Sequence, residues 1–445
     1  MFKVYFKLKN HVINTFKEND NLREKMKKVI YVAFNYNHDT GIASKRLRGV
    51  AKYLPTLGWQ PIVIVPRTSN ETVQIDNVRV VESDYRDMIS KFMPISNKNN
   101  AGRKREVSGN DQSNKFMSKA LSLAGEIFAY PDSMKYWKKP ATEVASEIIE
   151  NEKIDAIMST SSPMTSHLIA HDLKEKYGIP WVADLRDLWN LNPYINHNII
   201  RRQFEKRLEM KTFENVDVLT TTTELAKQTL QRIHPSKKIV PVVSGFDPID
   251  FESVKQTEHS EKLTLIYAGS LYNGKRDPSI LFDAINQLIN ENRIEKDKII
   301  IDFYGDETNL LELSQKYNIQ DNVNIHGRIT QNEVLQHQMN SDVLLLISWM
   351  NESEKMFIPG KIYDCIGCKK PVLSIGYEEG SLKELIEKTN IGYHVSGVSE
   401  CKKAIYDYYS KYYNNELKYS GNEFAEDYSL KNTAKNFSKI LEEII

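Results

Sequence analysis

The sequence has little cysteine, no long apolar run and almost no net charge. Its 445 residues include three cysteines, too few for a disulfide framework, and no signal-peptide pattern precedes the first predicted strand, which favours the cytoplasm. No stretch approaches the roughly 18 apolar residues that span a bilayer. With 60 basic against 59 acidic residues, the chain lacks the positive excess typical of nucleic-acid-binding proteins, so no nucleic-acid partner is expected.

The chain is longer than one hydrophobic core usually supports, so we expect two domains. From Val29 onward, predicted strands alternate with predicted helices, which is typical of parallel α/β architecture. We expect one Rossmann-like domain over residues 28–245 and a second over residues 246–426, with an interdomain cleft as the default ligand site. Residues 427–445 form a predicted terminal helix that returns to the first domain.

Two further segments are basic. Residues 1–27 interleave aromatic and basic side chains, a pattern that suits an anionic membrane face but equally suits a solvated or domain-packed helix. Residues 95–119, which include Arg103 to Arg105, lack periodicity and are interpreted as a flexible surface loop.

Two loops in the second half carry features of phosphate binding. The loop from Ala268 to Pro278 connects a predicted strand to a predicted helix. Gly269 and Gly274 permit tight backbone turns, and Lys275 and Arg276 supply positive charge. Further along, a predicted strand leads to a helix that begins at Pro359-Gly360-Lys361, with the amides of Gly360 to Ile362 in its first turn. Helix N-termini and lysines at the carboxyl edge of a parallel sheet are where α/β proteins hold phosphates. We therefore predict a diphosphate site.

These segments together resemble retaining GT-B glycosyltransferases of the family 4-like group, which uses nucleotide sugars to build bacterial polysaccharides. Gly269 to Lys275 has the spacing of that family's diphosphate loop, and Phe303-Tyr304-Gly305-Asp306 matches its Gly-Asp turn. The resemblance implies a GT-B fold and a donor nucleotide whose base lies near Gly305, Arg328 and Ile329. It also implies that Gly41, in the first loop, approaches the donor phosphate.

The family's two glutamates, separated by seven residues, have only one carboxylate counterpart here. The second falls on Asp364, which the resemblance makes the ribose ligand, and the first falls on Met356. Glu352 and Glu354 lie just upstream, and we take Glu354 as the candidate that reaches the sugar.

On the acceptor side, loops that follow predicted strands supply small hydroxyl and charged residues. Ser161 and Ser162 follow one strand, and Asp184, Arg186 and Asp187 follow another. His38 in the first loop and Asp184 are further catalytic candidates. The three charged residues equally fit a structural ion-pair cluster.

No metal or other cofactor is expected. Lysine and helix-terminal amides can stabilise a departing diphosphate, and no DxD-like element stands out. Cys365 and Cys368 form a CxxC pair, but without further zinc ligands they are interpreted as packing residues.

The resemblance predicts a hexosyltransferase that moves a sugar from a UDP- or GDP-type donor to a lipid-linked or growing glycan acceptor, with retention, in capsule or lipopolysaccharide biosynthesis. We expect it in the cytoplasm, at the inner face of the plasma membrane. Two alternatives stay open: a nucleotide-sugar epimerase of the same fold, and a non-catalytic sugar-nucleotide-binding protein.

Overall fold

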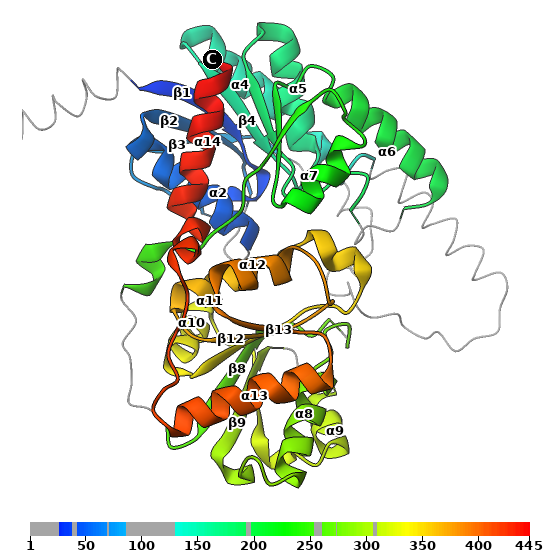
Figure 1. The fold of residues 1–445 in the computed structure, drawn as a ribbon. Helices are drawn as coiled ribbons and strands as arrows, with labels where there is room; N and C mark the ends of the chain where they lie inside the picture. Colours follow the sequence, from blue (N-terminus) through cyan, green and yellow to red (C-terminus); the bar gives the residue numbers. More distant parts are fainter. Residues whose placement is uncertain are drawn as a thin grey trace, which may run out of the picture.

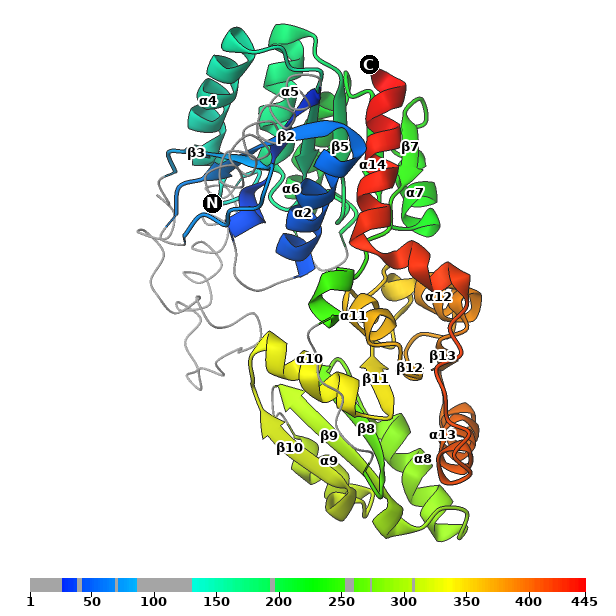
Figure 2. The same ribbon diagram turned by 90° about the vertical axis from the view of Figure 1, so that its left-hand side faces the viewer.

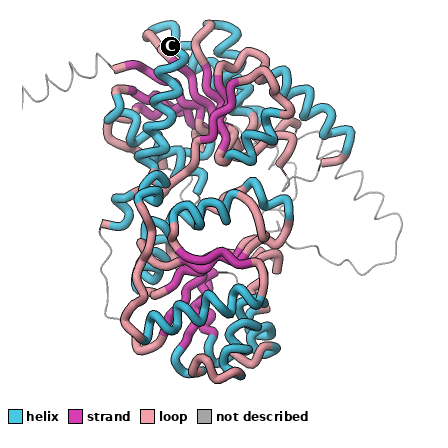
Figure 3. The backbone as a smooth tube through the Cα atoms, in the orientation of Figure 1, coloured by secondary structure: helices cyan, strands magenta, loops and turns pink. Residues whose placement is uncertain are grey.

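The structure is a computed structural model with two lobes, each built around a parallel sheet (Figure 1, Figure 3). It describes residues 26–37, 42–68, 71–85, 130–192, 197–252, 260–272, 274–305 and 309–445. His38, Gly41, the basic loop 95–119 and almost all of the segment 1–27 lie outside the described residues, so the expectations for them stay predictions.

Within the described residues, seven strands form the first sheet in the order β3-β2-β1-β4-β5-β6-β7, and every neighbouring pair is parallel. The strands are β1 (Lys27–Val32), β2 (Trp59–Pro66), β3 (Arg79–Ser83), β4 (Ala156–Thr160), β5 (Trp181–Asp184), β6 (Val218–Thr221) and β7 (Lys238–Pro241). The helices of this lobe are α2 (Ile42–Tyr53), α4 (Lys138–Asn151), α5 (Thr165–Tyr177), α6 (Ile199–Thr212) and α7 (Glu224–Gln231).

The second sheet has six strands within the described residues, again all parallel, in the order β10-β9-β8-β11-β12-β13. The strands are β8 (Leu263–Gly269), β9 (Ile299–Gly305), β10 (Val323–Gly327), β11 (Val343–Ile347), β12 (Val372–Ile375) and β13 (Gly392–Val395). The helices of this lobe are α8 (Ser279–Asn290), α9 (Leu310–Lys316), α10 (Gln331–Asn340), α11 (Lys361–Cys368), α12 (Ser381–Thr389) and α13 (Val398–Tyr413). The last helix of the chain, α14 (Leu430–Ile444), packs on the first lobe.

Both sheets are buried on both faces. In β1, Ile30 and Val32 pack into one hydrophobic cluster, while Val29 and Tyr31 pack into the cluster on the opposite face. β8 alternates in the same way between two clusters of the second lobe. Helices on both faces of a parallel sheet require such continuous apolar strands, and the predicted α/β class is confirmed.

The two chain segments that connect the lobes run side by side. The Phe246 amide donates to the Tyr428 carbonyl (2.9 Å), and the Leu430 amide donates to the Phe246 carbonyl (2.8 Å). A parallel bridge joins Phe246 to Ser429. α14 then lies along α2 in the first lobe (Figure 1, Figure 2). The second lobe is therefore tied to the first by paired backbone as well as by chain connectivity.

The ends of two helices follow from local sequence. α2 ends at Tyr53, because Pro55 opens a separate 3-10 turn over Leu54–Leu57. The terminal helix begins at Leu430, after a 3-10 turn over Glu423–Tyr428. Within the described ranges, no helix is both long and apolar enough to cross a membrane.

Candidate active site

A cavity of about 530 Å³, here called the central pocket, lies between the lobes and is lined by residues from both. The first lobe and the connection contribute Arg186, Asp187, Thr222 and Ser244. The second lobe contributes Tyr272, Lys275, Arg276, Trp349, Glu354, Phe357, Ile358, Gly360 and Tyr363. Six of the residues singled out in the sequence thus share one pocket: Lys275, Arg276, Gly360, Glu354, Arg186 and Asp187.

The two cations of the β8–α8 loop each lie over an aromatic ring. Lys275 Nζ is 4.6 Å from the ring centroid of Trp349, and the Arg276 guanidinium is 4.5 Å from that of Tyr272. Aromatic faces attract cations without neutralising them as a carboxylate would. This wall of the pocket is therefore suited to an anionic guest.

The end of β8 makes room for a third cation. Gly269 has φ 145°, and a Cβ at this position would overlap Lys361 Nζ. At the end of β9, Gly305 has φ 138°, and a Cβ there would overlap the Gly269 carbonyl. The two glycines expected near the diphosphate and base therefore allow the strand ends and the Lys361 ammonium to come close together.

The first turn of α11 places only part of the expected phosphate site at the pocket. Gly360 lines the central pocket. The Ile362 side chain is fully buried, and its amide already donates to the Pro359 carbonyl (3.0 Å). The diphosphate contact expected from the Ile362 amide does not fit this arrangement, because that donor has a partner within its own turn.

The loop before α11 directs two of its residues to different parts of the molecule. Glu354, in the 3-10 helix Glu352–Met356, lines the central pocket. Met356 instead packs against the core cluster of the first lobe, and its carbonyl accepts a hydrogen bond from Thr223 Oγ1 (2.7 Å). Met356 therefore joins the lobes, and Glu354 is the carboxylate of this segment that faces the pocket.

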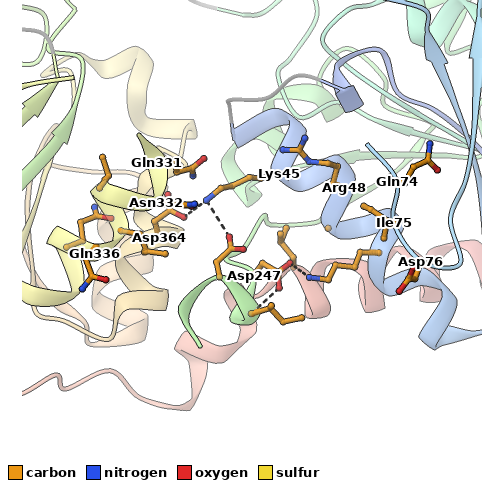
Figure 4. A pocket seen from close by; sticks show the side chains of 18 residues that line it. Lys45, Arg48, Gln74, Ile75, Asp76, Asp247, Gln331, Asn332, Gln336 and Asp364 are labelled. Carbon is orange, nitrogen blue, oxygen red and sulfur yellow. Dashed lines mark hydrogen bonds and ion pairs between the residues drawn. The ribbon is translucent and has the colours of Figure 1, made fainter. Parts of the chain in front are cut away.

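Asp364 lies on a second cavity of about 780 Å³, the outer pocket, between α2 on one side and α10 and α11 on the other (Figure 4). Lys45 reaches across from α2, with its Nζ 3.1 Å from Asp364 Oδ1 and 3.7 Å from Asp250 Oδ2. The carboxylate expected to hold the ribose is thus engaged by a cation of the opposite lobe. Sequence reasoning missed Lys45, because nothing in its neighbourhood indicates a partner 319 residues away.

The residues expected near the base lie beside the outer pocket. Ile329 packs against the core cluster around α11, and Arg328 is exposed. Two residues later, Gln331 and Asn332 begin α10 and line the outer pocket.

Asp184 belongs to a buried ion pair. Arg46 Nη2 lies 3.2 Å from Asp184 Oδ1, and each side chain is 1% exposed. The hydroxyls of Thr160 and Thr220 also donate to the Asp184 carboxylate. The ion partner of Asp184 is thus Arg46, whereas Arg186 pairs with Asp187. This burial favours a structural role, and the catalytic role expected for Asp184 stays a prediction.

The remaining acceptor-side residues divide between pocket and support. Arg186 and Asp187 line the central pocket and pair with each other (2.6 Å). Ser161 is buried at 3% exposure, and its hydroxyl bonds to the carbonyls of Asp184 and Asp187. Ser162 is exposed, and its carbonyl accepts from Asn35. Ser161 therefore supports the loop instead of facing the cleft.

The CxxC pair lies among apolar side chains. Cys365 and Cys368 belong to the same hydrophobic cluster as Ile362 and Ile366. Burial raises the pKa of Cys365 to about 12, so its thiol stays protonated near neutral pH and is a poor metal ligand.

The comparisons with known proteins agree with this geometry. Residues 262–411 match the family described as "Glycosyl transferases group 1". Among solved structures, the chain is similar to sucrose-phosphate synthase from Thermosynechococcus elongatus, at 12% identity and a TM-score of 0.61 over 94% of this chain and 98% of that one. It is also similar to a glycosyltransferase from Rickettsia africae ESF-5, at 16% identity and a TM-score of 0.57 over 94% and 98%. HepE from Anabaena, solved with UDP-glucose, matches at 12% identity and a TM-score of 0.55 over 94% and 99%. No curated protein matches the sequence significantly.

The structural similarity defines the fold as GT-B, as the sequence predicts. Within it, residues 262–411 are a group 1 glycosyltransferase domain. This class of enzyme takes its sugar from a nucleotide sugar.

Replacing Asp184 by alanine should destabilise the first lobe by about 3 to 5 kcal/mol, because the buried Arg46 charge loses its partner. Chemical denaturation followed by tryptophan fluorescence measures this. The double variant Arg46→Leu/Asp184→Ala leaves no buried charge at this position and should be more stable than the single variant. A single variant that unfolds like the wild type but has lost turnover would instead restore a catalytic role.

Proposed function

We propose that the protein transfers a hexose from a UDP- or GDP-type nucleotide sugar to a lipid-linked or growing glycan acceptor, with retention, in cell-surface polysaccharide biosynthesis. The observation that carries the proposal is the central pocket, where the cations of the β8–α8 loop face polar residues of the first lobe. Such a pocket can hold a sugar diphosphate on one wall and an acceptor hydroxyl on the other.

The donor would extend from the central pocket toward the outer pocket. Gly360 lines the first and Asp364 the second, and the two are four residues apart in sequence. In a helix this spacing corresponds to about 6 Å along the axis. A diphosphate at Lys275 and Gly360 would therefore bring the attached ribose toward Asp364, whose two carboxylate oxygens can accept from a vicinal diol.

In the transfer step, the bond between the sugar C1 and the β-phosphate oxygen breaks, and a bond from C1 to the acceptor oxygen forms. The departing diphosphate gains negative charge, which Lys275 and Arg276 in the lining of the central pocket would stabilise, with Lys361 beside the end of β8 at Gly269. The acceptor hydroxyl loses its proton to the departing phosphate. Glu354 faces the same pocket and would contact the sugar hydroxyls.

Incubating the protein with UDP- and GDP-sugars, with and without a polyprenyl-linked saccharide, tests the proposal. Transfer predicts a glycosylated acceptor and one nucleoside diphosphate released per sugar moved. Conversion of the donor sugar without acceptor would indicate the epimerase. Thermal stabilisation by nucleotide sugars without turnover on any acceptor would indicate a binding protein.

Lys275→Ala should weaken binding of the preferred nucleoside diphosphate by about 1.5 to 3 kcal/mol, because a charge-assisted contact to the diphosphate is lost. Isothermal titration calorimetry measures the change. Lys296→Ala is the matched control, because Lys296 pairs with Asp321 on the surface of the same lobe, outside both pockets. Equal affinities of wild type and Lys275→Ala would contradict the assignment.

Lys45→Met should tighten nucleotide binding roughly two- to fivefold, because Asp364 no longer has to leave a partly exposed ion pair before it meets the ribose. The control is Lys174→Met in the same lobe, whose partner is Asp217 (2.8 Å) and which lines neither pocket. Titration of both variants with the same nucleotide compares them. Weaker binding by Lys45→Met alone would mean that Lys45 itself contacts the donor.

A further inference from the structure

Helix α6 exposes an unusual number of apolar side chains. Ile199 is 80% exposed, Ile200 72%, Phe204 53% and Met210 50%. The helix lies at the outer edge of the first lobe (Figure 1) and begins at Asn198, whose side chain caps it by accepting from the Arg201 amide (2.8 Å). Apolar residues this exposed and this close together mark an interaction surface.

The charges of α6 are divided between its two faces. Its exposed charged residues are all basic: Arg202, Lys206, Arg207 and Lys211. Both of its acidic residues are buried. Glu205 bonds to Arg201 and to Trp189 Nε1, and Glu209 accepts from the Asn190 amide (3.2 Å). The outward face of α6 therefore combines four cations with four apolar side chains and carries no acidic group.

The spacing repeats along the helix. Arg202 and Lys206 are four residues apart, as are Arg207 and Lys211, and so are Ile200 and Phe204. Residues four apart project from the same side of a helix, so apolar and basic groups alternate across one broad face. At an anionic lipid surface, exposed apolar side chains can insert while the long lysine and arginine side chains reach the headgroups, so one face can present both.

Charge complementarity indicates what kind of partner this face fits. Residues 1–25 contain six basic and three acidic residues, and residues 86–129 contain eight basic and four acidic residues. Both segments carry net positive charge, as the α6 face does, so neither complements its charge. An anionic occupant complements it.

We propose that the exposed face of α6 docks on an anionic lipid bilayer. The helix is also linked to the central pocket: Trp189 lies two residues after Asp187, which lines that pocket, and donates to Glu205 of α6 (2.6 Å). Docking at α6 therefore holds the acceptor wall of the pocket near the bilayer. This deepens the proposed function by locating its acceptor at a membrane surface, and the docking is measured without turnover.

The experiment uses vesicle flotation with the full-length protein, phosphatidylcholine vesicles and vesicles that also contain phosphatidylglycerol. The wild type should float only with the anionic vesicles. Arg202→Gln/Lys206→Gln/Arg207→Gln should reduce binding at least roughly tenfold, since each cation near an anionic surface adds to the attraction. Its matched control, Lys431→Gln/Lys435→Gln/Lys439→Gln, removes three exposed charges from α14 and should bind as the wild type does.

A second variant tests insertion. Ile199→Ser/Ile200→Ser should also reduce binding, while Leu311→Ser, at a 57% exposed position on α9, should not. Circular dichroism and thermal melting confirm that each variant is folded. Lack of wild-type binding, or binding unchanged in both α6 variants, would overturn the proposal. Retention on heparin or nucleic acid that the isoleucine variant does not alter, together with weak vesicle binding, would assign the face to a polyanion instead.

Discussion

The backbone pairing of Phe246 with residues 428–430 is the constraint on which the site depends. Two chain segments cross between the lobes, and their hydrogen bonds make them a single two-stranded connection. This connection lies on one side of the cleft, and the carboxyl ends of both sheets face the cleft. On the opposite side of the cleft, no described chain segment crosses between the lobes. Met356 supplies the contact there: it packs on the first lobe's core, and its carbonyl accepts from Thr223.

This second contact gives a physical reason for a methionine at position 356. A glutamate in place of Met356 would leave its carboxylate against the apolar cluster of the first lobe, at a considerable desolvation cost. The methionine makes the lobe contact favourable, and Glu354 presents a carboxylate to the central pocket from two residues earlier. The single 3-10 turn Glu352–Met356 therefore supplies both the lobe contact and a carboxylate of the pocket.

The sequence predicts the fold, and it singles out six residues that line the central pocket, because both rest largely on local patterns. Apolar strands, glycines at strand ends and a lysine at a helix start are readable within ten residues, and Gly269, Lys275 and Gly360 lie where such patterns place them. What it does not predict depends on pairing between distant segments. In the sequence, Asp184 has the pattern of a loop carboxylate, but in the structure it pairs with Arg46. Asp364 has the pattern of a ribose ligand, but in the structure it pairs with Lys45 of the other lobe.

The charged residues of this protein fall into two groups: those paired with an opposite charge and those that are not. The chain has 60 basic and 59 acidic residues, so most charges can pair with a neighbour of opposite sign. Buried carboxylates such as Glu205 form such ion pairs. Two groups of cations differ from this pattern. Lys275 lies over an aromatic ring, and the exposed basic residues of α6 lie on a face from which its glutamates are absent. These cations have no carboxylate partner among the described residues, so they lack the attraction that an ion pair provides. An anion from outside the chain would supply that attraction.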